Sequence, residues 1–248
     1  MLIDVFKLGG GESENQTFLQ SFAAELKERS QPFVVVHGGG REVARLQQLL
    51  GIVPRYVAGL RVTDATTLKL VEMVLVGEVN KRLVRLFNDA GLNALGLSGA
   101  DMRLLRARKM LIQENGVPAD LGYVGEITGI NTDFLHALLA QGVTPVIAPV
   151  AYGEDGCAYN VNADQVAVAV AKALGAAGLS FITDVPGVLG ESGLPMTSLS
   201  LTEAQDAIRD GIVRDGMIPK VKAAAAGVVE GIPHVSIGRA TTATRVYR

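Results

Sequence analysis

Short apolar runs rich in β-branched residues alternate along this chain with longer segments in which apolar residues recur three and four positions apart. The run Val34-Val35-Val36 is typical of a strand that is buried on both faces, as in a parallel sheet. Residues 16–29 carry their apolar side chains at helical spacing, which predicts a helix. Alternation of these two patterns predicts an α/β fold in which helices cover both faces of a mainly parallel sheet.

The same two patterns give the expected elements of the whole chain. Expected strands are 2–8, 33–37, 94–97, 144–148, 179–183 and 234–237. Expected helices are 16–29, 42–50, 63–88 with a break near Gly77, 131–141, 163–174 and two within 202–231. Between residues 103 and 127, short alternating pieces surround Glu114-Asn115-Gly116, which predicts antiparallel hairpins that project from the main sheet.

Composition and charge indicate the kind of molecule that the protein binds more than they indicate its fold. The chain has 248 residues, of which 48% are hydrophobic and 19% charged, and its net charge is −2. The basic residues are scattered, so we expect a small-molecule partner and no nucleic acid. A lone cysteine, Cys157, excludes an intrachain disulfide and a Cys-rich metal site and fits the cytoplasm. The apolar stretches are short and interrupted, so we expect no membrane contact.

Glycine-bearing turns at strand ends are the first candidates for chemistry, because open α/β sheets place their ligand crevices there. Glycine lets backbone N–H groups approach an anion, although a glycine turn is also ordinary punctuation between a strand and a helix. Neither a Walker A sequence nor GxGxxG occurs, so the P-loop and Rossmann interpretations lose their main support. The four turns are Lys7-Leu8-Gly9-Gly10-Gly11, His37-Gly38-Gly39-Gly40, Gly96-Leu97-Ser98-Gly99 and Asp184-Val185-Pro186-Gly187.

Two lysines favour phosphoryl transfer, because that reaction builds up negative charge that positioned cations stabilise. Lys7 ends an expected strand directly before glycines. Lys220 lies at the expected start of a helix, where the helix dipole does not favour a cation. Either lysine alone is equally well explained as a solvated surface residue.

The polar segment Tyr159–Gln165 precedes an apolar helix and admits two interpretations. Asn162 or Asp164 could simply cap the helix. Capping needs only one of these side chains, however, so Asn160, Asn162 and Asp164 together could hydrogen-bond a substrate and fix a lysine ammonium group.

Six motifs follow one another along the chain. They are Lys7-Leu8-Gly9-Gly10, His37-Gly38-Gly39-Gly40, Gly59-Leu60-Arg61-Val62-Thr63, Asn160-Val161-Asn162-Ala163-Asp164, Thr183-Asp184-Val185-Pro186-Gly187-Val188-Leu189 and Asp215-Gly216-Met217-Ile218-Pro219-Lys220. Their order resembles the amino-acid kinase family, and within it the enzymes that phosphorylate N-acetylglutamate. The Gly-Leu-Arg-Val-Thr and Asn-Val-Asn-Ala-Asp motifs are the specific ones, whereas the glycine turns are shared across the wider family.

This resemblance covers essentially the whole chain and implies a three-layer αβα sandwich around a mainly parallel sheet of about eight strands. It implies a single domain over residues 1–248, with an N-terminal lobe of about 1–150 for the amino-acid substrate and a C-terminal lobe of about 151–248 for ATP. The implied reaction is phosphorylation of the γ-carboxylate of N-acetyl-L-glutamate by ATP, in arginine biosynthesis. No general base is needed, because a side-chain carboxylate is already ionised at neutral pH.

The resemblance also implies roles for individual residues. Lys7 and Lys220 would stabilise the transferring phosphoryl group, and Asp164 would hold both lysines. Substrate would be bound by Gly38 and Gly39 at the reacting carboxylate, by Arg61 at the α-carboxylate, and by Asn160 and Asn162. Mg²⁺ would be held mainly by nucleotide phosphates, so no protein metal site is expected. The implied ATP-binding residues are Gly10, Gly11, Asp184, Val185, Pro186, Gly187, Val188, Leu189, Ile212, Val213 and Arg214.

Alternatives remain at this stage. A kinase for carrier-protein-linked aminoadipate or glutamate would share the lysines but alter the substrate end. Aspartate kinase and glutamate 5-kinase are weaker alternatives, because the chain has no room for their extra domains. A non-catalytic nucleotide or amino-acid sensor would not need Lys7, Asp164 and Lys220 together.

Assembly is expected to follow the family's two-fold homodimer. Its contact helix follows the Gly59–Thr63 segment, where Leu68, Val71, Leu75 and Val79 stand at helical spacing, although packing within one subunit would give the same pattern. Arginine-inhibited members resemble one another in having a helix ahead of the first strand. Here Leu2 already begins that strand, so we expect little inhibition by arginine.

Overall fold

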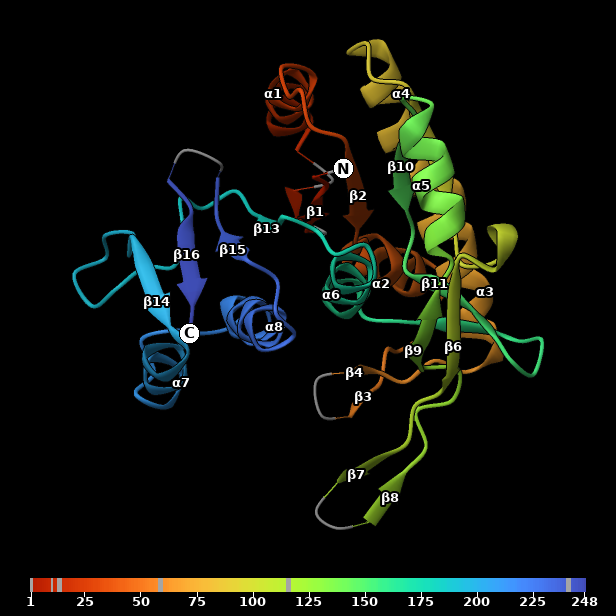
Figure 1. The fold of residues 1–248 in the computed structure, drawn as a ribbon. Helices are drawn as coiled ribbons and strands as arrows, with labels where there is room; N and C mark the ends of the chain where they lie inside the picture. The colour runs from red at the N-terminus through yellow and green to blue at the C-terminus, as the bar shows by residue number, and fades with distance from the viewer. Residues whose placement is uncertain (1, 10, 13–14, 58–59, 115–116, 240–241) are drawn as a thin grey trace.

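A computed structural model describes residues 2–9, 11–12, 15–57, 60–114, 117–239 and 242–248 (Figure 1). Eight strands form one sheet in the order β14-β16-β15-β13-β1-β2-β10-β5. In that order they are Ser198–Ser200, Thr244–Tyr247, His234–Ile237, Gly178–Ile182, Asp4–Leu8, Phe33–His37, Thr144–Ile147 and Ala94–Leu97. Neighbouring strands are parallel except β15 and β16. The expected mainly parallel sheet of about eight strands is confirmed, and it is continuous across both halves of the chain.

Strand β2 shows why helices cover both faces of this sheet. Val34 and Val36 lie in one hydrophobic core, and Phe33 and Val35 lie in the other. Because the side chains of a strand alternate between its faces, β2 is buried on both sides and the molecule has three layers. Helices α5 (Thr132–Ala140), α6 (Ala163–Ala173), α7 (Leu201–Arg209) and α8 (Met217–Val229) contribute to the first core. Helices α1 (Gln16–Lys27), α2 (Gly40–Leu49), α3 (Ala65–Val71) and α4 (Asn80–Asp89) contribute to the second.

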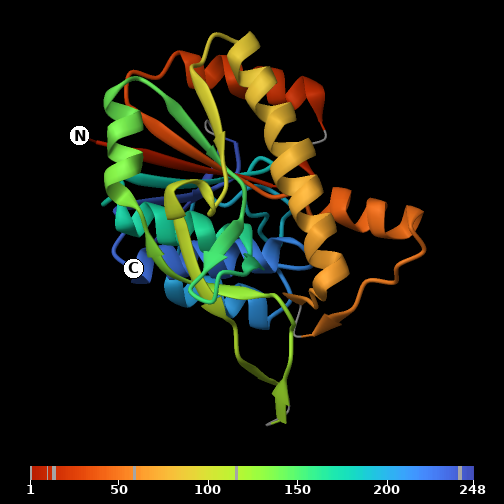
Figure 2. The same cartoon turned by 90° about the vertical axis from the view of Figure 1, so that its right-hand side faces the viewer.

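The expected helix break near Gly77 is wrong. Helix α3 passes into a π-helical segment, η2 (Glu72–Val79), which passes directly into α4, and Figure 2 shows the resulting long helix beside the sheet. A glycine inside a helix costs about 1 kcal/mol relative to alanine. Burial of Val74, Leu75 and Val79 stabilises the segment by more than that, at about 1.5–3 kcal/mol for each fully buried side chain. The helical turn therefore widens here instead of ending.

The antiparallel hairpins expected between residues 103 and 127 are confirmed. Strands β6 and β9 pair antiparallel within a second sheet of order β12-β11-β6-β9, and β7 and β8 form a hairpin that projects from the molecule (Figure 2). These strands are β6 (Leu105–Lys109), β7 (Ile112–Glu114), β8 (Val117–Ala119), β9 (Gly125–Ile130), β11 (Val150–Gly153) and β12 (Ala158–Asn160). A short 3₁₀ turn, η3 (Asp101–Arg103), precedes β6. No helix in the described ranges is long and apolar enough to cross a membrane.

Several short strands were not expected from the sequence. They have only two to four residues, which is at or below the shortest length at which alternation predicts a strand. Besides β11, β12, β14 and β16 they are β3 (Tyr56–Val57) and β4 (Leu60–Arg61).

Candidate active site

The turns that follow three central strands meet at one edge of the sheet. Leu8, at the end of β1, pairs in register with His37 at the end of β2 and with Ile182 at the end of β13. The turns after these strands therefore start at the same level, where α/β sheets bind their ligands. A cavity of about 520 Å³ opens there. Its lining includes Gly11, Gly40, Arg61, Asn160, Asn162, Asp184 and Lys220.

A buried ion pair lies beside this cavity. Lys7 of β1 and Asp164 in the first turn of α6 are both buried, and Lys7 Nζ lies 2.7 Å from Asp164 Oδ1. The contact is a charge–charge approach rather than an aligned hydrogen bond, since this Oδ1 atom has no hydrogen-bond partner among the described residues. Buried charges need such a partner, so the pair fixes the ammonium group of Lys7 at the strand end.

Lys220 brings a second ammonium group close to the first. It is half-buried in the first turn of α8 and lines the cavity. Burial, and next the positive charge of Lys7, lower the pKa of Lys220 from its ordinary value of 10.5. The opposing charges that partly restore it are Glu12, Asp164 and Asp184. Among the described residues, however, Asp164 forms its ion pair with Lys7 and none with Lys220.

The glycine turn after β2 has a backbone conformation that favours glycine. Gly39 has φ 153°, and a Cβ atom there would stand 2.5 Å from Leu75 Cδ2 on the long helix. The N–H of Gly38 donates to the carbonyl of Leu8 at 3.0 Å. Of the two glycines expected to bind the reacting carboxylate, Gly38 therefore already uses its N–H group within the fold.

His37 orders this turn as a neutral imidazole. Burial lowers the pKa of His37 to about 4, so the ring is uncharged at neutral pH. Its Nδ1 lies 2.8 Å from the carbonyl oxygen of Gly38, which can only accept, so Nδ1–H is the donor. Its Nε2 then accepts from Asn80 Nδ2 at 3.1 Å, and the same amide nitrogen donates to the carbonyl of Val146 at 2.9 Å. The chain of contacts connects the long helix to the glycine turn.

Arg61 projects into the cavity from β4 and is held on three sides. Its guanidinium donates to Gln47 Oε1 and, at 3.0 Å, to the carbonyl of Gly40, and it lies 5.0 Å from the centre of the Tyr56 ring. The remaining N–H groups of its planar fork are suited to a carboxylate. Gly59, the first residue of the Arg61 motif, lies outside the described residues.

The two asparagines of the polar segment have different environments. Asn160 is half-buried, and its Nδ2 donates to Thr63 Oγ1 at 3.1 Å, which leaves Oδ1 as an acceptor toward the cavity it lines. Asn162 is exposed, and its Oδ1 accepts from the N–H groups of Asp164 and Gln165 as the N-cap of α6. Of the two interpretations that the sequence left open, capping is therefore what Asn162 does within the fold.

The loop 184–189 is held by residues that follow it much later in the chain. Arg239 Nε donates to the carbonyl of Asp184 at 3.1 Å. Thr244 of β16 is fully buried, and its Oγ1 accepts from the N–H of Val188 at 2.8 Å and donates to the carbonyl of Met196 at 2.6 Å. The loop is therefore fixed by its backbone from the C-terminal hairpin.

The remaining expected ATP-binding residues are spread over this part of the molecule. Gly11 and Asp184 line the cavity, whereas Val188 and Val213 are buried in the core, so only their backbone could face a nucleotide. Leu189 and Arg214 are exposed. Gly10 lies outside the described residues. The others, Val185, Pro186, Gly187 and Ile212, are not among the residues that line the cavity.

Sequence reasoning missed several residues that the fold brings to the site. Glu12, Arg41 and Tyr56 line the cavity, and the guanidinium of Arg41 lies over Gly11, where a Cβ atom would come within 2.8 Å of its Nη1. Glu12 stands in a polar run with nothing to distinguish it from Glu14. For Arg41, its position directly after the glycine turn at Gly40 was the one feature of the sequence that could have indicated a site residue.

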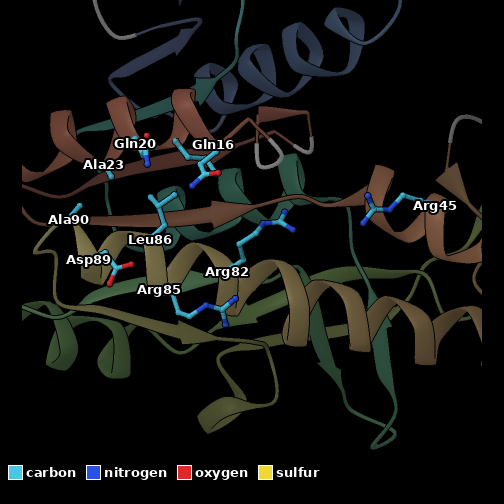
Figure 3. A pocket seen from close by; sticks show the side chains of 10 residues that line it. Gln16, Gln20, Ala23, Arg45, Arg82, Arg85, Leu86, Asp89 and Ala90 are labelled. Carbon is cyan, nitrogen blue, oxygen red and sulfur yellow. The ribbon is translucent and has the colours of Figure 1, made fainter.

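A roomier hollow of about 840 Å³ lies between α1 and α4, away from these strand ends (Figure 3). Figure 3 shows Leu86 and Arg82 of α4 on the side that faces Gln16 and Gln20 of α1. Arg82 is already paired with the buried Glu42 at 3.0 Å. Because none of the motif residues that the structure describes lines this hollow, we assign the chemistry to the smaller cavity.

No group of three or more His, Cys, Asp or Glu side chains in the described part of the chain is arranged to hold a metal ion. The expectation that Mg²⁺ is held by nucleotide phosphates therefore stays a prediction.

Fold and site place the chain among α/β enzymes that carry their chemistry at the carboxyl ends of parallel strands. The profile of the amino acid kinase family matches residues 4–238, and the chain belongs to this family. It is 48% identical to the acetylglutamate kinase of Solidesulfovibrio magneticus over 95% of this chain and 82% of that protein. It is 42% identical to the acetylglutamate kinase of Aquifex aeolicus over 94% of this chain and 83% of that protein.

Solved structures agree on the fold. The smu.665 protein from Streptococcus mutans has a TM-score of 0.87 and 31% identity, with 99% of this chain and 98% of that chain covered. Carbamate kinase from Giardia lamblia bound to AMP-PNP has a TM-score of 0.68 at 14% identity, covering 99% and 98% of the two chains, which shows the shared fold alone.

Proposed function

We propose that this enzyme transfers the γ-phosphoryl group of ATP to the γ-carboxylate of N-acetyl-L-glutamate, giving N-acetylglutamyl 5-phosphate in arginine biosynthesis. The observation that supports this most directly is the buried Lys7–Asp164 pair, with its 2.7 Å contact, beside a cavity lined by Arg61, Asn160 and Lys220. The names of the curated relatives point to the same reaction.

The acceptor end of the site matches the groups of N-acetylglutamate. Arg61, held in place by Gln47 and Gly40, pairs with the α-carboxylate through its free N–H groups. Asn160, whose Nδ2 is used by Thr63, accepts a hydrogen bond from the acetamido N–H through Oδ1. Gly39 offers its backbone to the reacting carboxylate. Asn162 contributes by capping α6 and thereby fixing Asp164.

The phosphoryl end needs positive charge rather than a base. Lys7 and Lys220 stabilise the negative charge that develops on the transferring group, and Asp164 orients Lys7 directly. The N-terminal lobe thus binds the acceptor and the C-terminal lobe binds ATP, with Gly11 and Asp184 next to the phosphates. Mg²⁺ accompanies the nucleotide phosphates. We place the enzyme in the cytoplasm as a two-fold homodimer.

The alternatives are less well supported. A kinase for carrier-linked aminoadipate or glutamate would need a different acceptor end, and the curated relatives compared above carry the acetylglutamate name. A sensor without catalysis would not need two ammonium groups close enough to lower a lysine pKa.

Comparison of acceptors tests the proposal. Coupled measurement of ADP release with acetylglutamate, glutamate, aspartate and N-acetylaspartate should show turnover with acetylglutamate well above the other three. Arg61→Lys should raise KM for acetylglutamate much more than KM for ATP, because lysine cannot form a bidentate clamp. Arg55→Lys, at an exposed arginine in the same segment, is the matched control and should change neither. Preference for another acceptor, or equal effects of Arg61→Lys on both KM values, would overturn the assignment.

A further inference from the structure

Glu12 is a buried carboxylate for which the proposed function has no role. It follows the glycine turn after β1, and only 5% of its surface is exposed. Carboxylates are almost never buried to this extent unless they are paired or hydrogen-bonded. No lysine or arginine in the described ranges lies within ion-pair distance of Glu12, so its partners are groups other than side-chain cations.

The carboxylate bridges the two turns that approach the nucleotide site. Its Oε1 accepts a hydrogen bond from the backbone N–H of Asp184 at 3.3 Å, across from β1 to the loop after β13. Its Oε2 lies where a Cβ atom on Gly9 would stand, so the side chain folds back over the glycine turn. Glu12 thus places an anion against a glycine turn and a backbone N–H, which are the groups that cradle phosphate.

The negative charge of Glu12 acts on the ammonium group of Lys220. Glu12 lines the same cavity as Lys220 and raises the pKa of Lys220, in opposition to the effects of burial and of Lys7. A nucleotide phosphate near the two lysines would supply the same compensation. A phosphate group bound against Gly9 and the N–H of Asp184 would overlap the Glu12 carboxylate and be repelled by its charge, so the two could not share this place.

We propose that the Glu12 carboxylate lies in the place of a nucleotide phosphate group, compensates the charge of Lys220 there, and moves away when the nucleotide binds. The inference rests on the proposed ATP site but not on the identity of the acceptor. It makes Glu12 an internal competitor for phosphate, so that nucleotide affinity includes the free energy needed to displace it.

Glu12→Gln is the informative variant, because the amide keeps the size and the acceptor oxygen for the N–H of Asp184 and removes only the charge. Calorimetric titration with ADP in EDTA should show binding tightened by about fivefold or more. AMP, which has one phosphate fewer, should show a smaller change. Glu28→Gln, which removes an exposed charge at the end of α1, is the control and should leave both affinities unchanged. Thermal melting checks that all variants fold.

The possible outcomes separate this inference from the proposed function. Unchanged ADP affinity in Glu12→Gln, with normal melting, would show that Glu12 only ties two loops together and would overturn the inference. Weaker binding of ADP with Mg²⁺, but not in EDTA, would show instead that Glu12 is a metal ligand and would also overturn it. If the unaltered protein bound no ADP at all, the proposed function would fail first.

Discussion

Two ammonium groups of like charge, those of Lys7 and Lys220, lie close enough for the charge of Lys7 to lower the pKa of Lys220, after the larger effect of burial. Lys7 has Asp164 at 2.7 Å, whereas no carboxylate among the described residues lies within ion-pair distance of Lys220. The protonation of Lys220 therefore depends on more distant charges around the cavity, those of Glu12, Asp164 and Asp184.

The first residue-scale prediction concerns the alkaline limb of the pH profile. Lys220 acts as a cation, and its pKa lies below 10.5, so kcat/KM for ATP should fall as pH rises through a value below 10.5. Lys220→Ala should lower kcat by about 10²-fold or more at neutral pH, because a transition-state cation is lost.

Lys220→Arg keeps the positive charge and tests whether the alkaline limb arises because Lys220 loses its proton. Arginine does not lose its proton in the accessible range, so the variant should lack the alkaline limb even where its kcat is reduced. Initial rates between pH 7 and pH 11, with circular dichroism at each pH, provide the measurement. Persistence of the same limb in Lys220→Arg would assign it to another group.

At this scale the sequence indicates residues but not their partners. Lys7, Arg61 and Asp164 could be selected because motifs surround them, and the structure brings them to one edge of the sheet. Glu12 could not be selected, because its burial depends on a contact with Asp184 that lies 172 positions away. The use of the Gly38 N–H by Leu8 was equally invisible, since it depends on strand register.

Strand β16 supports the loop 184–189, which belongs to the proposed nucleotide site. It has four residues and pairs antiparallel with β15, and through Thr244 it contacts the loop 184–189. Its burial pattern alternates, with Thr244 and Val246 inside and Arg245 and Tyr247 outside. Alternation over four residues is at the lower limit at which it predicts a strand, so the sequence did not reveal this support.

The element-scale prediction is that Thr244→Val destabilises the protein and loosens the loop. Valine matches threonine in shape but leaves the N–H of Val188 and the carbonyl of Met196 without their buried partner, at a cost of about 1–3 kcal/mol. Urea unfolding should show that loss, and KM for ATP should rise more than KM for acetylglutamate. Thr242→Val removes an exposed hydrogen bond to the carbonyl of Pro186 and should change stability little. Equal stability of the two variants would contradict the argument.

Longer elements were predictable because their apolar residues are either periodic or continuous. Strand β2 coincides with its expected bounds, since its run of β-branched valines is typical of a strand buried on both faces. The expected break at Gly77 failed because propensity was weighed alone, whereas packing of Val74 and Val79 against the sheet decided the outcome. Local sequence preference correctly predicted a helix there, and tertiary contacts determine that this helix continues through Gly77.

Across the whole molecule, one edge of the large sheet is free to pair. Strand β5 is last in the strand order, so one side of its backbone has no neighbouring strand within the described sheet. Beside it, Leu68, Met73 and Val76 of the long helix line a hollow of about 720 Å³. Met73 is 64% exposed and Leu95 of β5 is 40% exposed, so apolar side chains face outward from both elements.

The structure changes which residues could form a dimer contact on that helix. Val71, Leu75 and Val79 are buried in the core of the subunit, so the helical spacing of these residues reflects internal packing. Leu68 alone of the four expected residues lines the outer hollow. The homodimer stays a proposal, and its contact is assigned to Leu68, Met73 and the edge of β5 instead.

The whole-molecule prediction follows from this assignment. Light scattering of the purified protein should give the mass of a dimer, about twice 26.0 kDa. Met73→Glu should shift it toward the monomer, because a charge placed in an apolar interface loses its hydration without gaining a partner. Leu194→Glu introduces the same charge at another exposed apolar residue, 68% exposed and far along the chain, and should leave the dimer intact. A monomeric unaltered protein would remove the dimer proposal, and dissociation by both variants would show that added charge, rather than this face, is responsible.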